Sequence, residues 1–421
     1  MNFSKKILSN GVRLISIPMP ASPTVTVMVL VEAGSKYETK DRNGISHFLE
    51  HFVFKGTTRR PKTADISREL DSLGAQYNAF TSQEFTGYYA KAHKDKTEKI
   101  LDIVADMYLD PTLPEIELEK EKGVVIQEIK MYEDEPSRNV QDLFMELMYG
   151  DQPTGRNIAG TEETVKSFSR EDLLLYRSEL YVGEATTIIV SGGFDEAVVD
   201  HVEKIFSVLP KPKKFEKPKV IESQVSPKIL IKEKETDQTH LVLGVRAFSV
   251  FDPQAPILRV LCAVLGAGMS SRLFTKLRDE LGLCYYVSAS PDLYTDHGIF
   301  QVSVGADTKK VPETIKAVME ELKRLKSELV SEEELRKTKD FLVGNLYLSL
   351  ESSDELAQFI GMQEVLRKPI KLAEQVSKEI EMVTPEQIKA LAQKLFIDQS
   401  LNLAIIGPFK DNSPFLDVLK F

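Results

Sequence analysis

The chain has 421 residues, of which 42% are hydrophobic and 28% charged, without a compositionally biased tract. Because a single core usually stops growing at about 250 to 300 residues, we expect two or more globular domains. The formal net charge of -10 at pH 7 disfavours a nucleic-acid partner, whose phosphates require a basic surface. The two cysteines are too few for a disulfide framework or a thiolate metal site.

The beginning of the sequence mixes polar and apolar residues, and no apolar stretch typical of a signal peptide follows the first lysines. The longest apolar runs, such as Thr24–Val31, have the length of a strand and fall short of the ~20 residues that span a bilayer. We therefore expect no membrane association and a cytoplasmic location.

Residues 44–57 read GISHFLEHFVFKGT and are expected to form a helix. His47 and His51 are four residues apart and so share one helix face, which allows two imidazoles to bind one metal ion. Glu50 lies about one turn from His47, where its carboxylate can act on a water molecule rather than bind the metal. Two histidines can share a helix by accident, so a third ligand is needed to decide.

The run from Leu118 to Glu128 predicts a second helix that offers this ligand. Glu121 and Glu128 are seven residues apart, two turns along one face, so that Glu128 can bind the metal while Glu121 orients a ligand histidine. Acidic and basic residues also alternate along this run, as they do on a solvated helix. The residues alone leave both interpretations open.

The sequence consists of two similar halves. A helix opening at Ser169 and a strand Thr187–Gly192 recur 215 residues later at Thr384 and Leu403–Gly407, and the same offset relates the helical patterns that begin at His93 and Thr308. The intervening segment is rich in proline and lysine and is typical of a linker. We predict two homologous α+β domains, 1–210 and 225–421, joined by a linker 211–224, each a mainly antiparallel sheet with helices packed on one side.

The second half provides an internal control. The histidine helix aligns there with Leu258–Leu265, and none of His47, Glu50, His51 and Glu128 has an equivalent. A repeated fold that carries these side chains in one copy only does not need them for folding, which favours a chemical role.

At these residues the chain resembles the pitrilysin family of zinc peptidases, peptidase family M16, which includes insulin-degrading enzyme and the beta subunit of the mitochondrial processing peptidase. The family pattern is HxxEH, commonly 76 residues, and a glutamate, with another glutamate seven positions before it. Here 76 residues separate His51 from Glu128, and Glu121 occupies the earlier position. Further similar segments include AGSKYE, NAFTSQEFTGYY and SSRLFTKLRDELGLCYYVSAS.

This resemblance implies a Zn²⁺ ion held by His47, His51 and Glu128, with Glu50 as the general base and Glu121 as a supporting catalytic residue. It also implies a substrate-binding role for Asn78, Ala79 and Phe80, on an edge strand to which an extended peptide adds. Arg278 and Tyr285 match residues that contact the substrate, Tyr285 at the oxyanion and Arg278 at a carbonyl. From the residues alone, a structural role is the more common interpretation, since an arginine on an amphipathic helix and a tyrosine at the start of a strand are frequent.

The activity implied is that of an endopeptidase that cuts peptides or unfolded polypeptides inside a closed chamber. The smaller members of the family pair two chains, and since this chain carries both sets of residues, a homodimer is expected, with a heterodimer as the alternative. A catalytically silent structural or assembly subunit is the competing function, which the retained ligands argue against. A purely structural zinc module fits less well because structural sites usually have four ligands. The same ligands would also accept cobalt or manganese.

Overall fold

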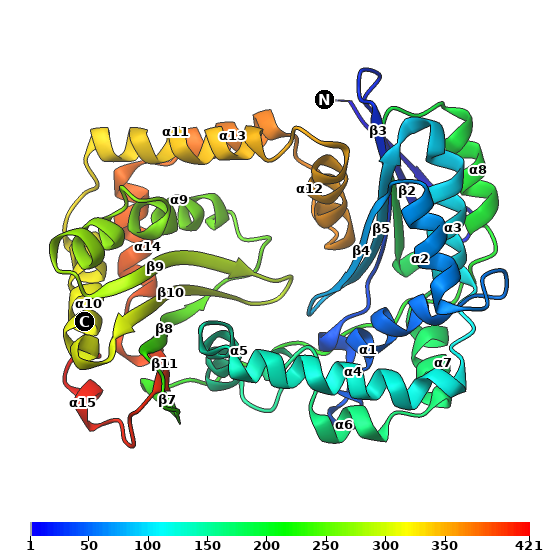
Figure 1. The fold of residues 1–421 in the computed structure, drawn as a ribbon. Helices are drawn as coiled ribbons and strands as arrows, with labels where there is room; N and C mark the ends of the chain where they lie inside the picture. The colour runs from blue at the N-terminus through cyan, green and yellow to red at the C-terminus, as the bar shows by residue number, and fades with distance from the viewer. Residues whose placement is uncertain (1) are drawn as a thin grey trace. The chain divides into compact units, whose positions relative to one another are not determined.

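The computed structural model describes residues 2–421 (Figure 1). The chain divides into two compact units. Unit 1 comprises the chain up to Lys130, Asn157–Pro218 and Tyr347–Leu372, and unit 2 comprises Met131–Arg156, Lys219–Leu346 and Ala373–Phe421. Both units combine a sheet with helices, which confirms the predicted α+β class with two domains.

Unit 1 contains a six-stranded sheet in the order β1-β2-β6-β3-β5-β4. All neighbouring strands are antiparallel except β2 and β6, which are parallel. The strands are β1 (Ser4–Ile7), β2 (Arg13–Pro18), β3 (Thr24–Val31), β4 (Gln76–Thr81), β5 (Thr86–His93) and β6 (Thr186–Gly192). The helices are α1 (Ile45–Phe52), α2 (Thr63–Ser72), α3 (Thr97–Leu109), α4 (Glu115–Asp134), which continues into unit 2, α6 (Glu162–Ser167), α7 (Arg170–Leu180), α8 (Ala197–Phe206) and α12 (Ser353–Val365).

Unit 2 contains a five-stranded sheet in the order β7-β11-β8-β10-β9, again with one parallel pair, β7 and β11. This order and pairing repeat those of β2-β6-β3-β5-β4, as expected for duplicated halves. The strands are β7 (Lys228–Glu233), β8 (Gln238–Ala247), β9 (Cys284–Leu293), β10 (Gly298–Asp307) and β11 (Asn402–Gly407). The helices are α5 (Pro136–Tyr149), α9 (Ala255–Gly266), a π-helix (Phe274–Glu280), α10 (Val311–Ser327), α11 (Glu332–Leu348), which ends in unit 1, α13 (Ala373–Glu381), α14 (Pro385–Leu395) and α15 (Ser413–Leu416).

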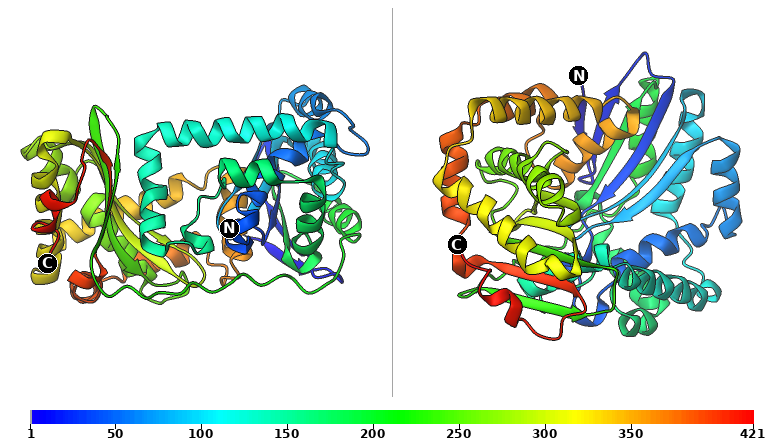
Figure 2. Two further views of the ribbon diagram at one scale, coloured as in Figure 1. Left: turned by 90° about the horizontal axis from the view of Figure 1, so that it is seen from below. Right: turned by 60° about the vertical axis from the view of Figure 1, so that its left-hand side comes forward.

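One face of each sheet carries the larger helical layer and the main core. The opposite face carries a single helix from the other half of the sequence. In unit 1, α12 packs on β3 and β6 (Figure 1), and Ala357 and Ile360 belong to the buried apolar cluster at this contact. In unit 2, α5 packs on β8 and β11 (Figure 2, left), and Val140 and Phe144 belong to the buried apolar cluster at this contact. Both sheets are therefore covered on two faces. The prediction had helices on one face only, so α5 and α12 add a layer to it.

The compact units depart from the predicted division of the chain at these two helices. The segment 211–224, predicted to be a linker, contains no helix or strand. However, residues 131–156 of the first half belong to unit 2, and residues 347–372 of the second half belong to unit 1. The reason is the apolar face of each of these helices, which is buried against the sheet formed by the other half of the sequence.

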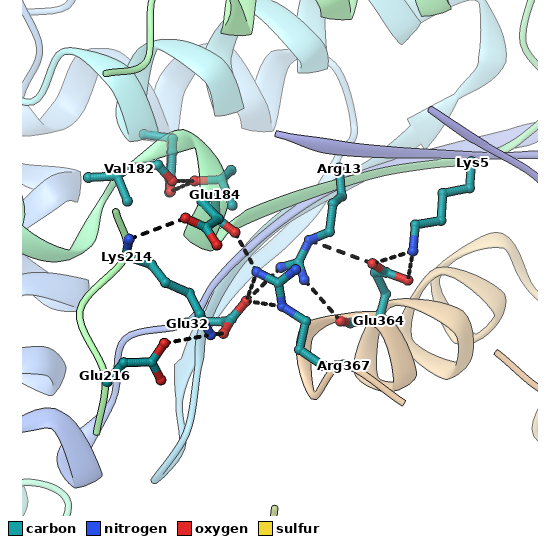
Figure 3. Close-up of polar contacts among 11 residues, drawn as sticks. Lys5, Arg13, Glu32, Val182, Glu184, Lys214, Glu216, Glu364 and Arg367 are labelled. Atoms are coloured by element: carbon teal, nitrogen blue, oxygen red, sulfur yellow. Dashed lines mark hydrogen bonds and ion pairs between the residues drawn. The ribbon is translucent and has the colours of Figure 1, made fainter. Parts of the chain in front are cut away.

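Within unit 1, a buried ion network connects the end of α12 and Lys214 of the segment 211–224 with the sheet (Figure 3). Glu32 accepts hydrogen bonds from Arg13 at 2.9 Å, Arg367 at 2.7 Å and Lys214 at 2.7 Å. Arg13, whose side chain is only 2% exposed, also lies near Glu364 on α12. Removing one member of such a network would leave a buried charge without its partner, which is strongly destabilising.

Within residues 2–421, no helix is both long enough and apolar enough to cross a membrane.

Candidate metal centre and active site

Helix α1 is amphipathic, and this orients the three polar residues of its motif. Ile45, Phe48, Leu49 and Phe52 follow the spacing i, i+3, i+4, i+7 and are fully buried in the core of unit 1. His47, Glu50 and His51 therefore share the opposite side of the helix. The apolar stripe thus fixes the direction in which the polar groups point.

Helix α4 brings Glu128 to the two histidines. The Oε2 atom of Glu128 lies 3.7 Å from Nε2 of His47 and 3.2 Å from Nε2 of His51. One ligand atom from each of the three residues lies within 4.8 Å of the other two. In a tetrahedral zinc site with bonds of about 2.1 Å, ligand atoms are about 3.4 Å apart, so the two nitrogens and one oxygen fit zinc and leave a fourth position open.

Glu121 and Lys55 extend this arrangement behind His51. Nδ1 of His51 lies 3.1 Å from one carboxylate oxygen of Glu121, and Nζ of Lys55 lies 2.5 Å from the other. Burial raises the pKa of Glu121, but the hydrogen bonds from His51 and Lys55 outweigh it and hold the pKa below its ordinary value. An ionised Glu121 selects the tautomer of His51 that leaves Nε2 free for a metal.

The carboxylates around His51 create a site for positive charge. Burial lowers the pKa of His51, but hydrogen bonds to Glu121 and Glu128 and the charge of Glu50 raise it to about 9. The same negative field favours a bound cation.

Glu50 is buried beside this site and bonded to the sheet. Thr81 on β4 donates a hydrogen bond of 2.6 Å to Oε2 of Glu50. Burial raises the pKa of Glu50, and the nearby charge of Glu128 adds to this shift, whereas Thr81 and His51 lower it. A carboxylate with a raised pKa is better matched to proton transfer near neutral pH.

Strand β4 is an edge strand of the sheet and lies against α1. Of the predicted substrate residues on it, Asn78 is exposed and Ala79 is buried. Phe80 is partly buried and packs against the rings of Phe85 and Tyr89. The structure thus places the predicted strand next to the motif helix, while the role of its residues in substrate binding stays a prediction.

Arg278 and Tyr285 belong to unit 2, and both are exposed. The guanidinium of Arg278 lies over the Tyr285 ring, 5.5 Å from its centroid, and also over Phe274 at 4.9 Å. Arg278 lies within the π-helix, a conformation common at functional sites. Their contact with a substrate stays a prediction.

The sequence did not identify Thr81 and Lys55 as members of the site. The position of Thr81 could have been predicted from the strand pattern, because residues two apart in a strand have their side chains on the same face, and Thr81 is two residues after Ala79. Lys55 lies four residues after His51 in the same motif. Its partner Glu121 is far away in the sequence, so the spacing of residues did not indicate that the two are in contact.

Two family models match the chain, Insulinase (Peptidase family M16) over residues 13–162 and Peptidase M16 inactive domain over residues 167–342. The chain is 37% identical to the "Uncharacterized zinc protease YmxG" of Bacillus subtilis, over 95% of this chain and 97% of that protein. It is 32% identical to an "Uncharacterized zinc protease" of Mycobacterium leprae, over 96% of this chain and 91% of that protein.

Solved structures share the fold. A protease from Helicobacter pylori has a TM-score of 0.90 at 21% identity, covering 97% of this chain and 99% of that one. A "peptidase M16 inactive domain" from Pseudomonas fluorescens has a TM-score of 0.88 at 19% identity, with the same coverage. With the matched family models and the relatives named zinc proteases, these findings lead to one conclusion: the chain belongs to peptidase family M16 and is a zinc metallopeptidase.

Proposed function

We propose that the chain is an endopeptidase that hydrolyses peptides or unfolded polypeptides, with His47, His51 and Glu128 as the zinc ligands. The single observation that carries this proposal is the convergence of Nε2 of both histidines on Oε2 of Glu128, at 3.7 and 3.2 Å. Bound zinc would polarise the attacking water and the scissile carbonyl.

In this proposal Glu50 takes the proton of the attacking water. One of its carboxylate oxygens accepts the hydrogen bond from Thr81, which fixes the orientation of the carboxylate. Glu50 then returns the proton to the leaving amine, as general acid–base catalysis requires. Glu121 keeps His51 in the orientation that presents Nε2.

We also propose that an extended substrate adds to the open edge of β4, which has only β5 as its neighbour in the sheet. Backbone hydrogen bonds of this kind tolerate many side chains, which suits an enzyme for unfolded chains. Arg278 and Tyr285 would complete substrate binding in a closed chamber formed by two copies of the chain. A cytoplasmic location and the homodimer are parts of the same proposal, and the mass of the assembly in solution tests the second.

The test is to measure bound zinc and the cleavage of a quenched fluorescent peptide by the wild type and by Glu50→Gln. We expect both proteins to bind zinc, and the rate of the variant to fall by a factor of about 10² to 10⁴, the usual contribution of a general base. Glu119→Gln, on α4 with a side chain 82% exposed, is the matched control and should behave as the wild type. A zinc-loaded wild type that cleaves no member of a broad peptide set would favour the catalytically silent subunit instead.

A further inference from the structure

The motif helix α1 begins without a cap of its own. Its N-cap residue is Gly44, which has φ of +95° and no side chain to accept a hydrogen bond. The first amides of a helix have no partner within the helix and need an acceptor from elsewhere. A helix of eight residues is also too short to be stable by itself, so its position depends on what holds its ends.

Glu38 supplies the missing cap from the segment AGSKYE. Its Oε2 accepts the backbone N–H of Gly44 at 2.7 Å, and its Oε1 accepts that of Ser46 at 2.9 Å. Asn43 donates a further hydrogen bond of 3.1 Å to Oε2. The Glu38 carboxylate is buried, with only 3% of the residue exposed, and it lies at the positive end of the helix dipole. It thus fixes the amide directly before His47.

The surrounding loop leaves the beginning of α1 little freedom to move. Asn43 also donates to the carbonyl of Asn157 at 3.0 Å. A side chain at Gly44 would come within 2.5 Å of the carbonyl oxygen of Ala159. The hydroxyl of Ser46 is 2.6 Å from that of Tyr176 on α7. The carboxyl group of Glu38 is the hydrogen-bond acceptor at the centre of this close-packed arrangement.

We propose that Glu38 is a positioning residue, which caps α1 from outside the helix and so sets the axial position and rotation at which His47 and Glu50 meet Glu128. A metal ligand or base displaced by about 1 Å can lose a factor of about 10² in rate. The inference rests on the proposed function for the identity of the ligands, but the contacts of Glu38 with α1 are independent of it.

The experiment compares Glu38→Gln with Asp65→Asn. The first variant keeps the volume of the side chain but replaces one acceptor oxygen by an NH₂ group facing an N–H donor. The second removes the corresponding acidic group at the start of α2, where Asp65 accepts the N–H of Lys62 at 3.1 Å. Neither change removes a group that binds metal or acts as a base.

Three quantities are measured: hydrogen exchange of the α1 amides with the metal removed, zinc affinity, and the visible spectrum of the Co²⁺-substituted protein. For Glu38→Gln we expect α1 amides to exchange about five- to tenfold faster and zinc affinity to fall by about tenfold. The Co²⁺ spectrum should also change, because it reports the ligand geometry. For Asp65→Asn we expect faster exchange in α2 only, with an unchanged spectrum.

An α1 exchange rate and a Co²⁺ spectrum like those of the wild type in Glu38→Gln would overturn the inference. If Glu38→Gln does not fold, Glu38→Asp, whose shorter side chain draws the carboxylate away from the N–H groups of Gly44 and Ser46, takes its place, and an unchanged α1 exchange rate in that variant has the same meaning. A wild type that binds no zinc would instead contradict the proposed function, and the exchange data would still decide whether Glu38 caps the helix.

Discussion

Replacing Glu121 by glutamine should weaken zinc binding without removing a ligand. The Glu121 side chain is 2% exposed and accepts one hydrogen bond on each oxygen, from His51 at 3.1 Å and from Lys55 at 2.5 Å. Glutamine has only one acceptor oxygen, so its NH₂ group must face either the histidine N–H or the lysine ammonium. A buried donor left unpaired in this way costs about 1 to 3 kcal/mol.

Without this partner His51 is held less firmly in the orientation that binds zinc, so part of the free-energy cost is measured as a loss of zinc affinity. Removal of such a supporting partner commonly lowers metal affinity by a factor of about 10 to 100, which corresponds to about 1.4 to 2.7 kcal/mol. The assay is a competitive titration of zinc against a chromophoric chelator at constant pH, with Glu119→Gln as the exposed control on the same helix.

Lys55→Met provides a second measurement of the same interaction, because it frees the other oxygen of Glu121. We expect a smaller loss of affinity in the same direction. Glu121→Gln with a zinc affinity within a factor of about two of the wild type would refute the reasoning, since His51 would then be oriented without its buried partner.

Three further predictions concern stability. Glu32→Gln leaves Arg13 buried beside a neutral group and should lower the free energy of unfolding by about 3 to 5 kcal/mol in a urea titration; a loss below about 1 kcal/mol would mean that the network is not important for stability. Phe144→Ala opens a cavity between α5 and the sheet of unit 2 and should cost about 3 to 5 kcal/mol, with faster hydrogen exchange in β8 and β11. Asp102 is partly buried, which raises its pKa, but hydrogen bonds from Arg60 and Arg59 hold it below the ordinary value. Its stabilising effect is therefore present above the unfolded-state pKa of about 3.9 and is lost as the pH falls through the folded-state pKa, so wild type and Asp102→Asn should differ in stability at pH 6 and converge towards pH 2.

The motif helix α1 shows how much of the site can be predicted from local sequence. The spacing of His47, Glu50 and His51 implied one helix face, and the apolar residues between them implied the opposite, buried face, because a helix has 3.6 residues per turn. The resemblance to a family added Glu128 as the third ligand. In the structure, one ligand atom from each of His47, His51 and Glu128 lies within 4.8 Å of the other two.

The repeat in the sequence likewise predicted two similar α+β domains, and the two sheets share their strand order. What it did not predict is that α5, from the first half of the sequence, belongs to unit 2 and that α12, from the second half, belongs to unit 1. The periodicity of a helix indicates which face is buried, but apolar side chains carry no information on which of two similar sheets covers them.

The sequence by itself therefore determined the fold class and the metal-binding motif with its two histidines, since these depend on residue type and spacing within single elements. Only the tertiary structure decided the partners of those residues. Thr81 reaches Glu50 from a neighbouring strand, Lys55 reaches Glu121 on α4 from the segment directly after α1, and Glu38 caps α1 from the loop before it. Hydrogen bonds of this kind depend on distances of a few tenths of an ångström between separate elements, which are set by the packing of the whole unit.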